Sequence, residues 1–150
     1  MADDLDPPSG HAPGGRGLDA KVVALGAALQ IAICVPPAIL VSSLRSDDLG
    51  AESNLWLVAA FVVLVAAPAA AGVLVGRRRP ESPLLHAALA AALGWSLLAG
   101  LSLVRATASG DEVAPLLATL LTMAPIQVGF GVLGALFLHP APSQPRETDQ

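Results

Sequence analysis

The sequence lacks tyrosine, has a single cysteine and contains only 3% aromatic residues. A lone cysteine, Cys34, cannot form an intrachain disulfide or a Cys-x-x-Cys redox pair, which argues against a thiol oxidoreductase. With so few aromatics and no basic stripe, the chain has neither base-stacking side chains nor a phosphate-binding surface. We therefore expect no nucleic-acid partner.

Charge is scarce and unevenly placed. Charged residues make up 13% of the chain, against roughly 25% in an ordinary soluble domain. A helix of a soluble bundle needs a polar stripe that faces water, and a membrane-spanning helix needs about 20 apolar residues. All 8 basic and 12 acidic residues lie outside four segments of that length, Val22–Leu44, Leu55–Gly76, Leu84–Val104 and Val113–Leu138. The sequence predicts an all-α polytopic membrane protein whose four transmembrane helices form one domain, 22–138.

The two ends of the chain have a different composition. Residues 1–21 are rich in Asp, Gly and Pro and lack the apolar core and cleavage site of a signal peptide. Residues 139–150 are similarly poor in apolar side chains. Both segments have too little apolar surface to offset the entropy of ordering, so we expect disordered tails. The first apolar segment would then act as an uncleaved insertion signal.

The basic residues predict an orientation. The connections between the apolar segments are short, so neighbouring helices form antiparallel hairpins. Basic residues are enriched in the flanks of membrane spans that face the cytoplasm. Six of the basic residues fall on one side of the membrane, and only Arg45 and Arg105 fall on the other. We therefore expect a protein of the plasma membrane with both termini in the cytoplasm. We expect its middle turn to lie at anionic lipid headgroups. The six are Arg16, Lys21, Arg77, Arg78, Arg79 and Arg146.

The two hairpins resemble each other, which favours a duplication. In an Ala-, Leu- and Gly-rich chain, chance similarity is the alternative. The repeat would run in parallel, unlike the inverted repeats of many transporters. The matched positions are Arg45 with Arg105, Ser42 with Ser102, Ala27–Leu29 with Ala87–Leu89, Pro68 with Pro125 and Gly72 with Gly129.

Pairs of small residues four positions apart occur in three of the four segments. Such a pair lies on one helix face and allows two backbones to approach closely, which replaces the hydrophobic drive that is lost in lipid. We expect these pairs to pack helices together within the chain. They are Gly72 with Gly76, Ser96 with Gly100, and Gly131 with Ala135.

Gln30 and Gln127 are the most polar side chains within the predicted spans. Their depths differ by only about 5 Å at 1.5 Å per residue. They are expected to hydrogen-bond to each other and close the fourth helix against the first. The alternative is that they line a polar path together with Thr119 and Thr122. We prefer the structural interpretation because no ionisable residue accompanies them.

Other residues in or next to the spans receive structural interpretations. The four internal prolines are expected to produce static kinks rather than hinges. His86 and His139 lie at the cytoplasmic ends of helices, and without a carboxylate or thiolate at ligand spacing they predict interfacial histidines rather than a metal site. Trp56 fits an outer aromatic belt, and Trp95 a packing role. No cofactor is predicted. The prolines are Pro36, Pro37, Pro68 and Pro125.

The stretch Ala67–Trp95 joins a Gly-spaced helix that ends in Arg to a helix that opens with Pro-Leu-x-His. Gly72, Gly76 and Arg77 carry the first part, and Pro83, Leu84 and His86 the second, with Ala87 where a glycine is expected. In these features the chain resembles small four-helix membrane proteins of bacteria, including actinobacteria. The resemblance implies a fold and a membrane location and brings no activity with it.

No catalytic constellation is visible. There is no Ser/His/Asp set, acidic pair or metal-ligand cluster at a membrane face, so we expect a protein that is not an enzyme. The preferred interpretation is an accessory or structural membrane subunit that forms a homo-oligomer or pairs with another membrane protein. The alternative is a small oligomeric transporter or channel. Proton coupling through a carboxylate within the membrane has no candidate, because the spans contain no Asp or Glu.

Overall fold

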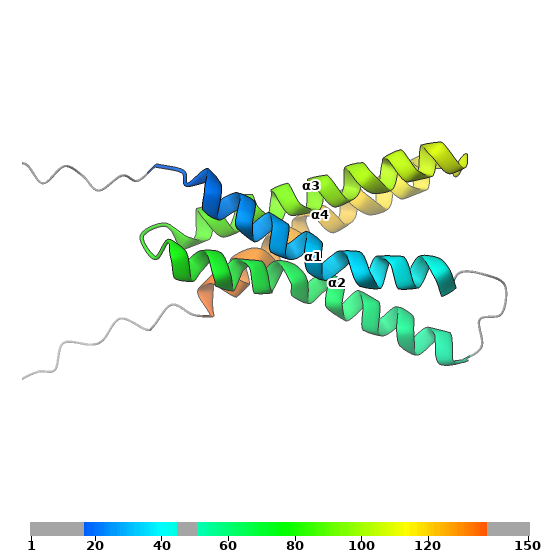
Figure 1. The fold of residues 1–150 in the computed structure, drawn as a ribbon, viewed down its shortest axis with the longest axis horizontal. Coiled ribbons are helices and arrows are strands. Elements are labelled where there is room, and N and C mark those ends of the chain that lie inside the picture. Colours follow the sequence, from blue (N-terminus) through cyan, green and yellow to red (C-terminus); the bar gives the residue numbers. More distant parts are fainter. Residues whose placement is uncertain (1–16, 45–50, 138–150) are drawn as a thin grey trace, which may run out of the picture.

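A computed structural model describes residues 17–44 and 51–137. Within these ranges the chain forms four helices, α1 (Ala20–Leu44), α2 (Ala51–Arg78), α3 (Pro83–Ser109) and α4 (Val113–Leu136) (Figure 1). The predicted all-α, four-helix fold is confirmed. All four helices are long and apolar enough to cross a membrane, which fits a multi-pass membrane protein. Most of the predicted tail 1–21 and the whole of the predicted tail 139–150, which contains His139, lie outside the described residues.

Three of the helices extend beyond the uncharged runs that predicted them. α1 begins at Ala20 and so includes Lys21, α2 begins at Ala51 and continues through Arg78, and α3 continues through Arg105 to Ser109. A charged side chain ends an apolar run without ending a helix, because its long stem can lie along apolar surface while its head stays in water. α4, by contrast, ends at Leu136, before the predicted Leu138.

The turn between α3 and α4 shows why α3 ends at Ser109. Gly110 has a φ of 73°, in the left-handed region that glycine adopts without steric cost. The N–H of Asp111 donates to the carbonyl of Ala106 at 2.9 Å, the closing bond of a Schellman motif. At its other end, α3 starts on Pro83, whose missing N–H is not needed in a first turn.

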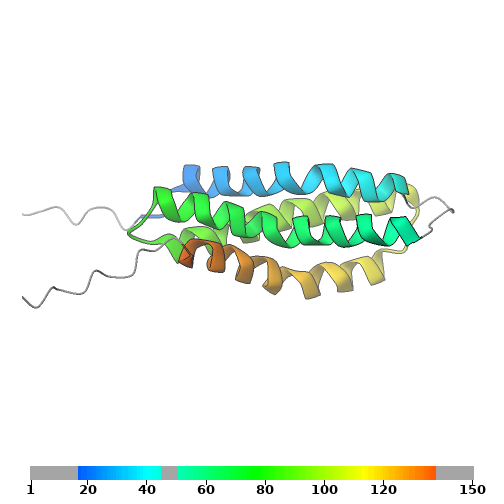
Figure 2. The ribbon, with the colours of Figure 1, turned by 90° about the horizontal axis from the view of Figure 1, so that it is seen from below.

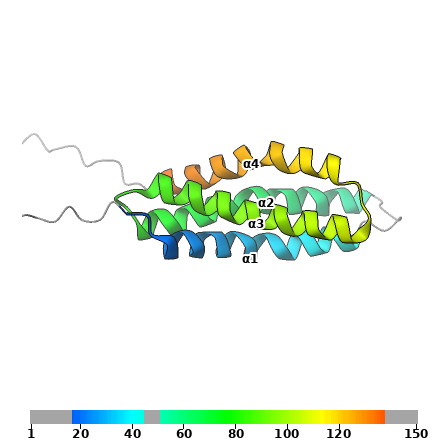
Figure 3. The same cartoon turned by 90° about the horizontal axis from the view of Figure 1, so that it is seen from above.

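α2 and α3 occupy the middle of the bundle. They contact each other, and each contacts both of the outer helices, α1 and α4. Among the described residues no backbone contact forms between α1 and α4, and Figures 2 and 3 show them on opposite sides. The predicted glutamine contact between the fourth helix and the first is made by long side chains across the bundle, and the two helices do not pack directly against each other. Figure 3 also shows α4 bending near its middle, where Pro125 stands.

The tightly packed core occupies the half of the bundle next to the Arg77–Pro83 turn. Towards the other end the α1–α2 pair and the α3–α4 pair diverge (Figure 1). Most of the buried apolar residues are alanines, so the backbones approach closely, as membrane helices do when small residues line their contacts. Among the described residues, Pro68 and twelve other apolar side chains are buried, and of these only Ala106 lies far from that half. The twelve are Val23, Ala27, Cys34, Ala67, Ala71, Val75, Ala87, Ala90, Ala91, Trp95, Ala106 and Ala135.

Candidate functional site

The structure brings the two predicted glutamines together at the centre of the bundle. Gln30 on α1 and Gln127 on α4 are 0% and 1% exposed. The Nε2 of Gln30 donates a hydrogen bond to the Oε1 of Gln127 at 3.4 Å. Since α1 and α4 are not neighbours, the two side chains bridge the bundle from its opposite sides. This bridge is the candidate functional site.

Gln127 makes a second bond that depends on a proline. Pro68 has no N–H, so the carbonyl of Leu64, four residues earlier in α2, loses the donor that an ordinary helix would provide. The Nε2 of Gln127 donates to this carbonyl at 3.4 Å. A side chain of α4 thus supplies the bond that the proline removes from α2, which is one way in which membrane helices tolerate an internal proline.

Gly94 on α3 makes room for the bridge. A Cβ atom at position 94 would lie 2.6 Å from the Oε1 of Gln30, closer than a non-bonded contact allows. The same Oε1 is buried and has no hydrogen-bond partner among the described residues. The bridge therefore joins α1, α2 and α4 by hydrogen bonds, and α3 contributes the space that the Gln30 amide occupies.

The predicted companions of the glutamines lie elsewhere. Thr119 and Thr122 are exposed, and their hydroxyls donate to the carbonyls of Pro115 and Ala118 within α4. Trp95 is buried, and its indole N–H donates to the carbonyl of Leu120 at 3.2 Å. This bond ties α3 to α4 just before the bend at Pro125.

Two of the three small-residue pairs meet at the α2–α4 contact. A Cβ on Gly72 would lie 1.9 Å from the carbonyl oxygen of Gly131, and one on Gly76 would lie 3.3 Å from the Cα of Ala135. Sequence reasoning gave no packing role to Gly134, where a Cβ would lie 2.0 Å from the carbonyl oxygen of Ala69. Its only signal was the presence of a third closely spaced glycine in that segment.

The third pair requires a correction. Ser96 and Gly100 are exposed, and a Cβ on Gly100 would meet nothing within 4 Å. The Ser96 hydroxyl donates to the carbonyl of Ala92 in its own helix at 2.8 Å. Two small residues that are four positions apart lie on one helix face, but this spacing does not determine whether that face meets another helix. Here the face points out of the bundle, so the predicted packing within the chain is wrong.

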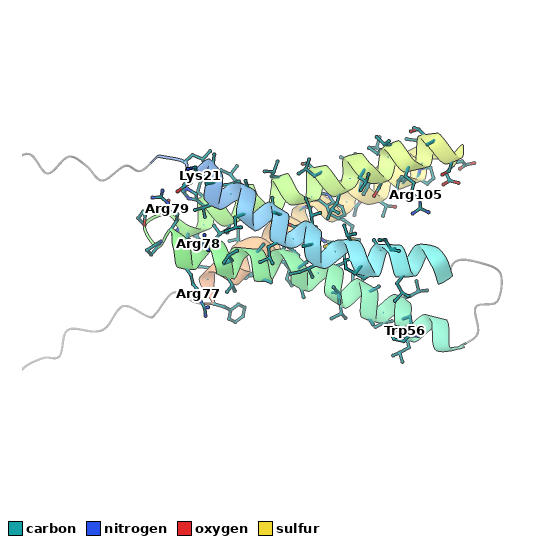
Figure 4. All side chains as sticks on the ribbon, in the orientation of Figure 1. Lys21, Trp56, Arg77, Arg78, Arg79 and Arg105 are labelled. Carbon is teal, nitrogen blue, oxygen red and sulfur yellow. The ribbon has the colours of Figure 1, made fainter. Side chains whose placement is uncertain are left out.

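The basic turn contains two kinds of arginine. Figure 4 shows Lys21, Arg77, Arg78 and Arg79 at the same end of the molecule, opposite Arg105. Arg77 and Arg78 are exposed, as lipid headgroup contacts require. Arg79 is instead engaged within the protein, which leaves it less available to lipid than predicted.

Arg79 joins the start of α1 to the turn before α3. Its guanidinium donates to the carboxylate of Asp19 through both Nε and Nη2, and its Nη1 donates to Glu81 at 2.9 Å. The hydrogen bonds from Arg79 lower the pKa of both carboxyl groups below their usual values. The carboxylates therefore stay charged at neutral pH. Glu81 lies in the same turn as Arg79, but Asp19 is 60 residues away, so sequence spacing gave no indication of the contact between Arg79 and Asp19.

His86 lies at the same end but is buried rather than interfacial. It is 1% exposed. Its Nε2 accepts the backbone N–H of Asp19 at 3.0 Å, so in the neutral ring the proton is on Nδ1, 2.9 Å from the carbonyl of Ser82. The ring fixes the entry of α1 against the first turn of α3. Within residues 17–44 and 51–137 no three metal-ligating side chains come together.

No protein-family model, curated protein or solved structure matches the chain. The resemblance to small bacterial four-helix membrane proteins stays a prediction, and the functional argument rests on the residues described above.

Proposed function

We propose that the chain is a non-enzymatic accessory or structural subunit of a membrane assembly. The observation that supports this role is the closed centre of the bundle. The two glutamines there bond to each other and to a backbone carbonyl, so their polarity is used in holding helices together. Around them, glycine contacts bring α2 and α4 to backbone distance, which leaves little space between these two helices.

A small oligomeric transporter or channel is the second candidate. It is favoured by the Gln30 Oε1 atom, which is buried without a hydrogen-bond partner among the described residues, and by the divergence of the two hairpins (Figure 1). In this candidate a solute path runs between hairpins or between copies of the chain, and the glutamines contact the solute.

Flux through proteoliposomes separates the two candidates. We expect purified protein, reconstituted at several protein-to-lipid ratios, to conduct K⁺, Cl⁻ and small neutral solutes no faster than protein-free vesicles, because the central polar groups are bonded to each other. The matched variants are Gln127→Leu and Thr107→Val, since Thr107 is exposed and its hydroxyl is bonded within the last turns of α3. A flux that Gln127→Leu abolishes and Thr107→Val preserves would establish the transporter instead.

The proposed orientation places both termini and the Arg77–Pro83 turn in the cytoplasm of a cell whose plasma membrane holds the protein. It is supported by the grouping of Lys21 with the arginines of the turn at one end of the bundle (Figure 4) and by the cytoplasmic enrichment of basic residues.

Labelling of intact cells tests this orientation. In a Cys34→Ser background, Asp111→Cys is expected to react with a membrane-impermeant maleimide from outside, whereas Pro80→Cys reacts only after permeabilisation. Both positions are exposed in the structure, so accessibility depends on the side of the membrane. Reaction of Pro80→Cys in intact cells would reverse the proposed orientation.

A further inference from the structure

An apolar groove runs along the outer side of the contact between α2 and α4. Its volume is about 400 Å³, within the range of roughly 300–1,000 Å³ that is usual for ligand sites. The chain has only three phenylalanines, and all three line this groove. The lining residues are Phe61, Val62, Val65, Ala66, Ala69, Phe130, Leu133, Gly134 and Phe137.

The groove extends through one leaflet and past the middle of the bilayer, because its lining residue Phe61 stands sixteen residues before Arg77, roughly 24 Å deeper. Ala66 stands eleven residues before Arg77 in α2, which places it roughly 17 Å deeper at 1.5 Å per residue. One leaflet contributes about half of the ~30 Å hydrocarbon core. An acyl chain that starts at the level of Arg77 therefore passes Ala69 and ends near Ala66.

A basic side chain stands at the headgroup end of the groove. At about 100° per residue, Arg77 lies about 20° around α2 from Ala66 and about 80° from Ala69, whereas Arg78 lies about 120° and 180° from the same two residues. Figure 4 places Arg77 beside the end of α4. Both arginines are exposed. Arg79 is held by Asp19 and Glu81, which leaves Arg77 as the exposed cation of this turn that lies nearer to the groove.

We propose that this groove is a binding site for one anionic phospholipid, with an acyl chain in the groove and the phosphate at Arg77. Charge favours a lipid over a second copy of the chain. A two-fold symmetric contact through this face would bring residues of equal depth together, and so would place the Arg77 side chains of the two copies near each other. An anionic headgroup neutralises Arg77 instead. The inference rests only on the chain spanning a bilayer, so its failure would leave the proposed subunit role standing.

Native mass spectrometry of protein released from vesicles of phosphatidylcholine and phosphatidylglycerol tests the site. The wild-type protein is expected to retain one phosphatidylglycerol in preference to phosphatidylcholine. Ala66→Leu fills the groove and is expected to lose the retained lipid. Its control, Ala28→Leu, adds the same side chain at an exposed position of α1 that does not line the groove, and is expected to retain the lipid.

The headgroup contact has its own pair of variants. Arg77→Gln is expected to lower the preference for phosphatidylglycerol about fivefold, the equivalent of roughly 1 kcal/mol per basic residue. Arg78→Gln, which removes the same charge on the opposite side of α2, is expected to leave the preference unchanged. If Ala66→Leu does not fold, the two arginine variants test the proposed lipid site on their own. Equal effects of the two arginine variants, no preference in the wild type, or a dimer that Ala66→Leu dissociates would overturn the proposal.

Discussion

Gly72→Ala is expected to destabilise the bundle by about 3 kcal/mol, the upper end of the cost of overpacking. The added Cβ would lie 1.9 Å from the carbonyl oxygen of Gly131 and 2.9 Å from its carbonyl carbon. Both atoms belong to backbone, so no side chain can rotate away, and α2 and α4 must separate along a packed contact. Reversible unfolding in bicelles, followed by circular dichroism, measures the loss.

Two further alanine substitutions calibrate this expectation. Gly76→Ala lies on the same face of α2, but its nearest neighbour would be the Cα of Ala135 at 3.3 Å, so a shift of a few tenths of an ångström accommodates it and we expect a cost below about 1 kcal/mol. Gly129→Ala meets nothing within 4 Å. It is expected to be neutral or slightly stabilising, because alanine has the higher helix propensity. Equal losses in all three variants would show that helix flexibility, and not the α2–α4 contact, determines stability.

These glycines show how much of the helix packing could be predicted from the sequence. Their spacing within α2 and α4 placed each pair on one helix face, and the structure brings those two faces together. The same spacing in α3 predicted a contact for Ser96 and Gly100 that does not form. A pattern within one helix is set by local geometry, whereas the partner of that face depends on how the helices are arranged, and the sequence carried no signal for the divergence of the hairpins.

The central site was predicted only in part, and the reason is similar. The matching depths of Gln30 and Gln127 followed from counting residues along two helices. The bond from Gln127 to the Leu64 carbonyl depends in addition on Pro68 of α2 facing α4, which is a matter of helix rotation. The burial of Pro68 contrasts with the exposure of Pro125, its partner in the predicted repeat. The duplication stays a prediction, and these two positions now have different surroundings.

Gln127→Leu is expected to cost about 1–2 kcal/mol, more than Gln30→Leu, because the two glutamines have unequal roles. Loss of Gln127 leaves both the Gln30 amide and the Leu64 carbonyl without a partner in a buried apolar setting. Loss of Gln30 leaves the bond to Leu64 intact, and also removes the Oε1 atom that has no partner among the described residues. The double variant is expected to cost less than the sum of the two single changes.

A second cycle isolates the role of the proline. Pro68→Ala restores the N–H that the Leu64 carbonyl lacks, so in that background the carbonyl no longer depends on Gln127. We expect Gln127→Leu to cost roughly 0.6–1.7 kcal/mol less in the Pro68→Ala protein than in the wild type, which runs from the average to the largest value measured for hydrogen bonds between membrane helices. The cavity left by the proline ring cancels in the cycle because it is present in both alanine variants. Thr122→Val, which alters an exposed hydroxyl bonded within α4, is the control and is expected to change stability little. If the effects of Pro68→Ala and Gln127→Leu simply add, the bond to the Leu64 carbonyl contributes nothing, and the centre of the bundle is held by glycine packing alone.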